Sequence, residues 1–224
     1  MEKKLTVVIS SKKSVKESNV LLENIESTVE VPCNIMYIQN DGVGLTTVYH
    51  EAMKKSETDI VLFIHDDIEF LRGGWGTELV RMFEEHQDFG IIGVAGSAEF
   101  EYNGMWWNYK KKFGQVLHRK DGQSWLTPFS PLLKKDLEEV CVIDGLFMAV
   151  HKKRISKEFN KEIEGFNFYD IDFCLSNFLD GKTKIGVTTN IRIAHNSIGE
   201  LSENWFKNRE IINEKYGDNY PIKV

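Results

Sequence analysis

Long hydrophobic runs are missing from this chain of 224 residues. No apolar segment reaches the roughly 18 residues that a membrane-spanning helix needs, and the apolar run near the N-terminus is too short for a secretory signal peptide. Proline is scarce, with 4 residues, and no internal repeat or low-complexity segment occurs. We therefore expect a globular protein without an integral membrane segment, located in the cytoplasm or peripherally at its membrane.

Cysteine and positive charge are also in short supply. Cys33, Cys141 and Cys174 are widely spaced, odd in number and form no CxxC pair, which predicts buried thiols in a reducing compartment. The net charge of −6 argues against a nucleic-acid partner, although a local basic pocket is compatible with it. With 42% hydrophobic residues, the chain can bury the core of one α/β domain over residues 1–224.

Strand and helix patterns alternate along the chain, which predicts βαβ units and a parallel sheet. In the first half we expect strands at 5–10, 33–39, 60–64 and 90–96, and helices at 16–25, 44–55 and 77–86. Residues 98–131 are rich in aromatic side chains and glycine without a helical period, which predicts a long excursion with short hairpins. Beyond it we expect strand character at 139–151 and 184–195, and helices at 170–179 and 201–216.

The segment DIVLFIHDD, residues 59–67, holds the first candidate site. Its continuous apolar run predicts a strand buried on both faces, and ligands bind beyond the carboxyl ends of such strands. That end carries His65, Asp66 and Asp67. Carboxylates there could hold Mg²⁺ or Mn²⁺ together with substrate phosphates. The same three residues would also be explained by a purely structural role, in which charged residues end the strand and cap a helix. The metal-site and the structural interpretations both stay open.

Two later motifs add candidate groups. Asp170 and Asp172 open a predicted helix, where acidic side chains suit the helix dipole. Because residues two apart do not share a helix face, one could cap the helix while the other points into a site and accepts a proton. His195 follows an alternating strand and precedes a polar run, so it is either a metal ligand or an ordinary histidine.

The order of these motifs resembles the family 2-like glycosyltransferases with the GT-A fold. HDD follows the third strand, and the aromatic excursion, VIDGLFMAV, GFNFYDIDFCL and IAHNSIG come after it. The resemblance extends from about residue 5 to residue 199. It implies a Rossmann-like domain with a central, mostly parallel sheet flanked by helices. Residues 1–97 would form the nucleotide-sugar-binding half and residues 98–224 the acceptor-binding and catalytic half.

The resemblance also implies metal and catalytic roles. Asp67 corresponds to the last Asp of the family's D-x-D motif and would bind the metal, while His65 stands where the first Asp usually stands. His195 corresponds to the late histidine that completes the coordination of Mn²⁺ or Mg²⁺. Asp170 falls at the position of the catalytic base, with Tyr169 in place of the preceding Glu. Asp172 is the reserve candidate for the base.

Donor and acceptor residues follow from the same resemblance. Ser10, Asn40, Asp41, His65 and Asp66 are the expected donor contacts, although Asn40-Asp41-Gly42 and Ser10-Ser11 differ from the usual family residues. Asp144 corresponds to a position near the acceptor, but an Asp before Gly also suits a β-turn. Trp106 and Trp107 either pack in the core or form a platform for an acceptor sugar.

The function implied is metal-dependent, inverting transfer of a sugar from a nucleotide-sugar to an acceptor hydroxyl of a glycan or another molecule, of the hexosyltransferase type. Two alternatives remain. A catalytically degenerate nucleotide- or sugar-binding module would explain why His65, Asn40 and Tyr169 depart from the family. A sugar nucleotidyltransferase could use a similar sheet, but it usually needs a glycine-rich loop after the first strand, where this chain has SSKK.

Overall fold

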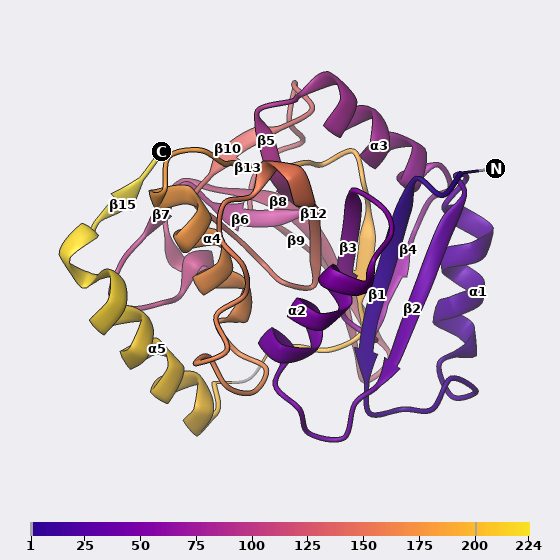
Figure 1. The fold of residues 1–224 in the computed structure, drawn as a ribbon, viewed down its shortest axis with the longest axis horizontal. Helices are drawn as coiled ribbons and strands as arrows, with labels where there is room; N and C mark the ends of the chain where they lie inside the picture. The colour runs from indigo at the N-terminus through magenta and orange to yellow at the C-terminus, as the bar shows by residue number, and fades with distance from the viewer. Residues whose placement is uncertain (1, 200) are drawn as a thin grey trace.

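The computed structural model describes residues 2–199 and 201–224, and a mixed seven-stranded sheet lies at its centre (Figure 1). The strand order is β10-β13-β5-β12-β3-β1-β2. β1, β2, β3, β5 and β13 run in one direction, and β10 and β12 run in the other. The bounds are β1 Leu5–Ser11, β2 Cys33–Gln39, β3 Ile60–Ile64, β5 Phe89–Gly93, β10 Glu138–Val140, β12 Phe147–His151 and β13 Lys184–Val187.

β3 is buried along its whole length. All five of its residues are buried, as its uninterrupted apolar run predicts. It lies between β1, which is parallel to it, and β12, which is antiparallel. The chain emerges from the carboxyl end of β3 directly into His65, so the central strand fixes where the following polar side chains lie.

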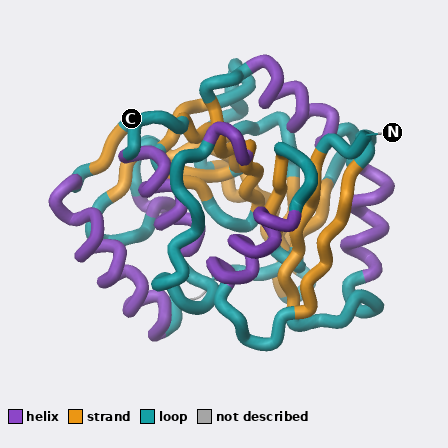
Figure 2. Tube along the Cα trace, in the orientation of Figure 1, coloured by secondary structure: helices purple, strands orange, loops and turns teal. Residues whose placement is uncertain are grey.

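Helices cover the central sheet, and Figure 2 shows the strands gathered between them. α1 and α5 lie at opposite ends of the molecule, while α2 and α4 lie between them in this view (Figure 1). The helices are α1 Asn19–Thr28, α2 Leu45–Lys55, α3 Trp75–Glu85, α4 Tyr169–Leu179 and α5 Glu203–Tyr216, with short 3₁₀ turns η1 Trp106–Asn108, η2 Lys152–Arg154 and η3 Gly217–Asn219. No helix in the described part of the chain is long and apolar enough to cross a membrane.

The first helix begins later than predicted. Residues 16–25 were expected, but a polar turn occupies the chain ahead of α1. The backbone N–H of Ser14 donates to the Glu17 carboxylate at 2.8 Å, and the N–H of Ser18 donates to the Ser14 carbonyl at 3.2 Å. The Glu17 N–H also lies 3.4 Å from Ser14 Oγ, so the two residues bond reciprocally as in a capping box and form a single turn ahead of α1, which begins at Asn19.

A second, six-stranded sheet accounts for segments that the sequence assigned to single strands. Its order is β11-β6-β8-β14-β4, and β9 pairs with β8. The expected strand at 90–96 divides into β5 and β6, and that at 139–151 divides into β10, β11 and β12, because the chain passes from one sheet to the other. The bounds are β4 Ile68–Phe70, β6 Ala95–Ser97, β8 Lys112–Lys120, β9 Gln123–Pro128, β11 Val142–Ile143 and β14 Ile193–His195.

The aromatic excursion is largely structured. β8 and β9 form an antiparallel hairpin, of the kind expected in this segment, with Lys120 opposite Gln123. β7 (Glu99–Phe100) pairs with β15 (Ile222–Lys223) near the C-terminus. The three cysteines are free; Cys141 and Cys174 are buried, and Cys33 is half-buried.

Candidate functional site

Two sheets together place the polar tip of β3. β4 follows Asp67 directly and pairs antiparallel with β14, so that His195 lies opposite Ile68. The backbone N–H of Asn196 donates to the Asp67 carbonyl at 2.9 Å. As a result, His195 Nε2 lies 3.3 Å from Asp67 Oδ1, although 128 positions separate the residues in sequence. This pairing brings the tip of the third strand and the late histidine together.

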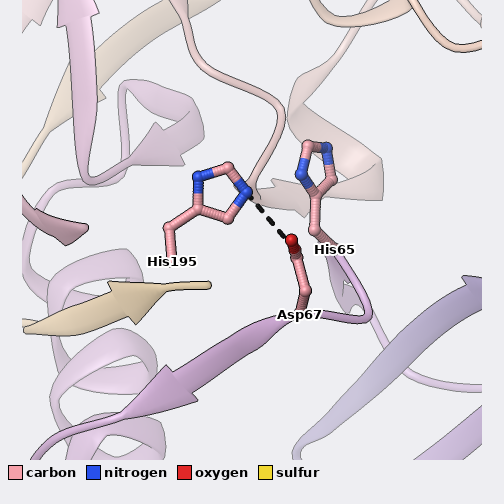
Figure 3. Close-up of side chains that lie close together, drawn as sticks. All are labelled: His65, Asp67 and His195. Atoms are coloured by element: carbon pink, nitrogen blue, oxygen red, sulfur yellow. Dashed lines mark ion pairs between the residues drawn. The ribbon is translucent and has the colours of Figure 1, made fainter. Parts of the chain in front are cut away.

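His65 completes a convergent group with Asp67 and His195. One ligand-capable atom from each residue lies within 4.8 Å of the other two, and Figure 3 shows the imidazoles and the carboxylate grouped together. Burial is the largest single effect and opposes ionisation of Asp67. The hydrogen bonds from His195 and Ser197 and the charges of the two histidines together outweigh it and hold the Asp67 pKa well below its usual range. Burial lowers the pKa of His65, which favours its neutral imidazole. Burial lowers the pKa of His195, but the Asp67 carboxylate, with Asp144, raises it overall, so His195 would release its proton when a cation binds. A carboxylate and two imidazoles are a suitable donor set for a divalent cation.

Asp66 faces away from this group. The Ser11 hydroxyl donates to the Asp66 carboxylate, and Lys13 Nζ lies 3.5 Å from the same oxygen. These groups border a cavity of about 530 Å³ at the carboxyl ends of β1 and β3. Its lining includes Ser10, Ser11, Lys12, Lys13, Asn40, Tyr49, His65, Asp66, Asp67 and Phe166. We call it the first cavity.

The predicted turn residues at the end of β2 behave differently from each other. Asn40 is buried, and its amide donates to Ser10 Oγ at 3.0 Å and to the Val43 carbonyl at 2.7 Å. Its Oδ1 accepts the Val43 N–H at 2.8 Å, so the side chain holds the turn as well as lining the cavity. Asp41 is exposed and is not among the residues that line the first cavity.

A second cavity, of about 690 Å³, lies on the other side of His65. Its walls come from η1, the β8–β9 hairpin, the start of α4 and the chain around β14 and α5. They include Trp106, Trp107, His118, Phe129, Asp144, Phe166, Phe168, Tyr169, Asp170, His195, Ile198, Leu201 and Trp205. Trp106 is only 3% exposed and Trp107 is half-buried, so both predicted tryptophans line this cavity while also packing against the core.

Asp170 enters the second cavity from the first turn of α4. The N–H of Gly145 donates to Asp170 Oδ2 at 2.7 Å, and the N–H of Ile171 donates to Oδ1 at 2.9 Å. Burial, reinforced by the negative charge of Asp144, raises the pKa of Asp170 to about 7. A carboxylate with that pKa is half-protonated near neutral pH and is suited to general base chemistry.

The close approach of Gly145 to α4 requires the absence of a side chain. A Cβ added at Gly145 would overlap the hydroxyl of Tyr169 and would lie 3.0 Å from the Cβ of Asp170. Phe168, immediately before α4, has a left-handed φ of 64°, and its buried ring packs 5.1 Å from the ring of Trp205. The left-handed conformation costs a non-glycine residue roughly 1 kcal/mol of free energy, so the packing around Phe168 must stabilise its backbone.

Asp172 does not reach either cavity. It is 1% exposed and lies on another face of α4, as the two-residue spacing from Asp170 predicts. Its Oδ1 accepts hydrogen bonds from Lys215 Nζ at 2.8 Å and from the Tyr216 hydroxyl at 2.9 Å. Asp172 therefore connects α4 to the end of α5, and Asp170 is the acidic residue of this helix that faces the second cavity.

Tyr169 and His118 are site residues that the sequence reasoning did not assign to a role. The Tyr169 hydroxyl lies 3.0 Å from His65 Nε2, and its position next to Asp170 was the signal available. His118 lies opposite His195 on the neighbouring parallel strand, with the ring centres 5.8 Å apart. No sequence signal could have identified His118, because only the β8–β14 register places it there.

Comparison with known protein families identifies one match that covers most of the chain. Residues 5–216 match the family described as "Glycosyltransferase like family". The chain belongs to that glycosyltransferase-like family. No curated protein matches this glycosyltransferase-like chain.

Solved structures of glycosyltransferases share the fold of this glycosyltransferase-like chain. A structure of GalNAc-T7 with UDP, GalNAc and Mn²⁺ superposes with a TM-score of 0.57 at 11% identity, over 95% of this chain and 48% of that one. S. aureus TarS 1-349 gives a TM-score of 0.54 at 11% identity, over 95% and 65%. TarS 1-349 in complex with UDP-GlcNAc gives 0.53 at 12% identity, over 95% and 66%. The chain thus spans about half to two thirds of these longer proteins, and at such identities the likeness concerns the fold.

Proposed function

We propose that this protein transfers a sugar from a nucleoside diphosphate sugar to an acceptor hydroxyl, with a divalent cation and with inversion at the anomeric carbon. The observation that carries the proposal is the meeting of the two cavities, because both include His65 and Phe166 in their walls. A reaction between two substrates needs adjacent binding spaces with the reacting atoms at their junction.

The first cavity suits the donor. Apart from Phe166, its lining residues come from positions 10–67, in keeping with a nucleotide-sugar-binding half at 1–97. Lys12 and Lys13 offer positive charge to a diphosphate, and Ser10 and Ser11 offer hydroxyl donors and acceptors to the nucleoside. Uridine donors are the first to test, since GalNAc-T7 and TarS hold UDP or UDP-GlcNAc.

Asp67 and His195, with His65 beside them, would hold the cation. When bound there, Mn²⁺ or Mg²⁺ would neutralise the charge that develops on the leaving nucleoside diphosphate. The chain contributes a preformed arrangement, since the β4–β14 pairing already fixes Asp67 and His195 side by side.

The second cavity suits the acceptor. All its lining residues except His65 lie beyond position 103, in keeping with an acceptor-binding half at 98–224. Aromatic faces such as Trp107 can pack against the apolar face of a sugar ring, and the Asp144 carboxylate can accept a hydrogen bond from a hydroxyl.

Asp170 would act as the base. Its carboxylate opens into the acceptor cavity, and a pKa of about 7 lets it take a proton from the attacking hydroxyl near neutral pH. The donor cavity lies across His65 from it, so attack from the Asp170 side and departure on the other side would invert the anomeric carbon.

A thermal-shift screen of UDP-, GDP-, dTDP- and CMP-sugars, with and without Mn²⁺, tests donor binding. We expect one nucleotide series to raise the melting temperature, with a larger rise when Mn²⁺ is present. Asp67→Ala should lose the additional rise in melting temperature that Mn²⁺ produces. Asp41→Ala, at an exposed position outside the cavity, serves as the matched control. No stabilisation by any nucleotide would contradict the proposal and favour a degenerate module. Stabilisation without turnover by any acceptor would favour the same alternative.

A further inference from the structure

We infer that the cation site of this chain has two imidazole ligands and one carboxylate ligand, and that it selects Mn²⁺ and Co²⁺ over Mg²⁺. The ligands are His65, Asp67 and His195. The inference rests on the proposed cation site, but it adds a third protein ligand and a metal preference.

The geometry brings all three side chains to one point. Their candidate ligand atoms lie within 4.8 Å of one another, and the side chains converge in Figure 3. Each is held by backbone structure: the His65 N–H donates to the Leu146 carbonyl at 3.2 Å, and His195 lies within the β4–β14–β8 strand pairing. The imidazole ring centres of His65 and His195 are 5.6 Å apart, which leaves room for an ion between them.

The second nitrogen of His65 is already engaged. His65 Nε2 lies 3.0 Å from the Tyr169 hydroxyl, which leaves Nδ1 for the cation. Metal-bound histidines usually pair their other ring nitrogen with an oxygen atom, which orients the ring and fixes its tautomer. Tyr169 is buried, and its ring packs against Tyr49 with centres 5.5 Å apart, so its hydroxyl is a fixed support for His65.

The two nearby carboxylates, Asp66 and Asp144, do not add oxygen ligands to the group. The Asp66 carboxylate accepts the Ser11 hydroxyl and faces Lys13 at 3.5 Å, on the side of the first cavity. The Asp144 Oδ1 accepts the Leu146 N–H at 3.0 Å and, in the described part of the chain, is not a member of the convergent group. The protein ligand set therefore contains two neutral nitrogen donors and a single charged oxygen donor.

This composition sets the metal preference. Mg²⁺ favours oxygen ligands and octahedral geometry, whereas imidazole suits later first-row cations. Affinity for mixed nitrogen and oxygen sites rises from Mn²⁺ to Co²⁺. We expect the order Mg²⁺ < Mn²⁺ < Co²⁺, with Co²⁺ bound at least about tenfold more tightly than Mg²⁺.

Direct titration of the full chain with each of the three cations tests the inference without requiring turnover. Calorimetry gives the affinities, and the visible absorption of bound Co²⁺ reports nitrogen ligation. His65→Asp should reduce the Co²⁺/Mg²⁺ affinity ratio about tenfold or more and shift the Co²⁺ spectrum, since it exchanges nitrogen for oxygen. Tyr169→Phe, which keeps the ring, should weaken Co²⁺ binding about tenfold by removing the support of His65. His151→Asp is the matched control, because His151 lies opposite Ile60 at the other end of β3, outside both cavities and the convergent group. Its Co²⁺/Mg²⁺ affinity ratio should stay at the wild-type value.

The outcomes separate this inference from the proposed function. Binding of Mn²⁺ and Mg²⁺ with equal affinity, or a His65→Asp ratio equal to that of the wild type, would overturn the two-imidazole site and leave metal-dependent transfer standing. A wild-type protein that binds none of the three cations, with and without UDP, would overturn the inference and the metal dependence together.

Discussion

The hydroxyl of Tyr169 lies 3.0 Å from Nε2 of His65 and joins the end of β3 to the start of α4. This contact stands at the junction of the two cavities, since His65 lines both and Tyr169 precedes the Asp170 carboxylate. A buried hydrogen bond of this kind fixes two segments relative to each other, which matters when a base must be held within a fraction of an ångström of its target.

Gly145→Ala should disturb that junction. The added methyl group would overlap the Tyr169 hydroxyl, so Tyr169 would have to shift, and with it the adjacent Asp170, whose carboxylate accepts the Gly145 N–H at 2.7 Å. We expect kcat to fall by about 100-fold. UDP affinity measured without a cation should change less, because the clash reaches the first cavity through Tyr169 and His65 and leaves Ser10, Ser11 and Asn40 untouched. Steady-state kinetics and calorimetry measure the two effects. Gly181→Ala controls for a general loss of stability, because a Cβ there meets open space, although Gly181 has a left-handed φ of 72° that Gly145 lacks. A wild-type kcat in Gly145→Ala would show that catalysis does not need the close approach of Gly145 to α4.

The raised pKa of Asp170 predicts the pH dependence of catalysis. Because the carboxylate must be ionised to accept a proton, kcat/KM should fall tenfold per pH unit below about 7 and level off above it. The rate profile should be recorded at saturating metal, with the donor concentration below its KM. A flat profile between pH 5 and pH 8 would exclude Asp170 as the titrating base.

The same shift predicts a pH-dependent stability difference between the wild type and Asp170→Asn. The folded pKa of Asp170 lies above its ordinary value of 3.8, so the folded state holds this proton more tightly than the unfolded state does. The contribution of the protonated Asp170 to the free energy of unfolding is fully present below about pH 4 and is lost as the pH rises through about 7. Denaturant unfolding should therefore show the wild type losing free energy relative to Asp170→Asn across that window. A difference in unfolding free energy between the two proteins that stays constant with pH would contradict the raised pKa of Asp170.

Asp172 should have a structural role and no catalytic one. Asp172→Ala removes the hydrogen bonds from Lys215 and Tyr216 in a buried place, which should lower the free energy of unfolding by about 1–3 kcal/mol. At temperatures where the variant is folded, kcat should remain within about twofold of the wild type. Urea denaturation and steady-state kinetics measure the two quantities. A stable variant without turnover would make Asp172 the base instead.

The anomeric configuration of the product follows from the placement of one base across the junction from the donor cavity. An α-linked nucleotide-sugar should give a β-linked product, because the acceptor hydroxyl attacks from the Asp170 side. Proton NMR of the first-formed product distinguishes the two anomers through the coupling constant of the anomeric proton. A retained configuration would require a different mechanism.

Much of the first half of the fold was predictable from local pattern. The apolar run of β3 and the alternation of strands and helices gave the parallel part of the sheet, since a doubly buried strand needs apolar residues throughout. The predicted strand at 139–151 failed in detail, because the division into β10, β11 and β12 depends on which sheet each piece joins. Short strands that change sheets carry no distinguishing local period.

The candidate site was also only partly predictable from local sequence patterns. Asp67, Asp170 and His195 could be named because each follows or opens a recognisable element in a motif order typical of glycosyltransferases. The structure brings together Asp67 and His195 and places Asp170 in the adjoining cavity. The contacts of His65 with Tyr169 and of His118 with His195 arise from strand register and close packing between distant segments, which no single stretch encodes.

The most direct test of the account is acceptor-dependent release of nucleoside diphosphate by the wild type and by Asp170→Asn, measured alongside donor affinity. Asp170→Asn should lower kcat by about 10³-fold or more, while donor affinity stays within about twofold, because Asp170 lies in the second cavity and not in the first. Asp172→Asn, two residues away and facing α5, should keep wild-type turnover. Wild-type turnover by Asp170→Asn would contradict the central claim.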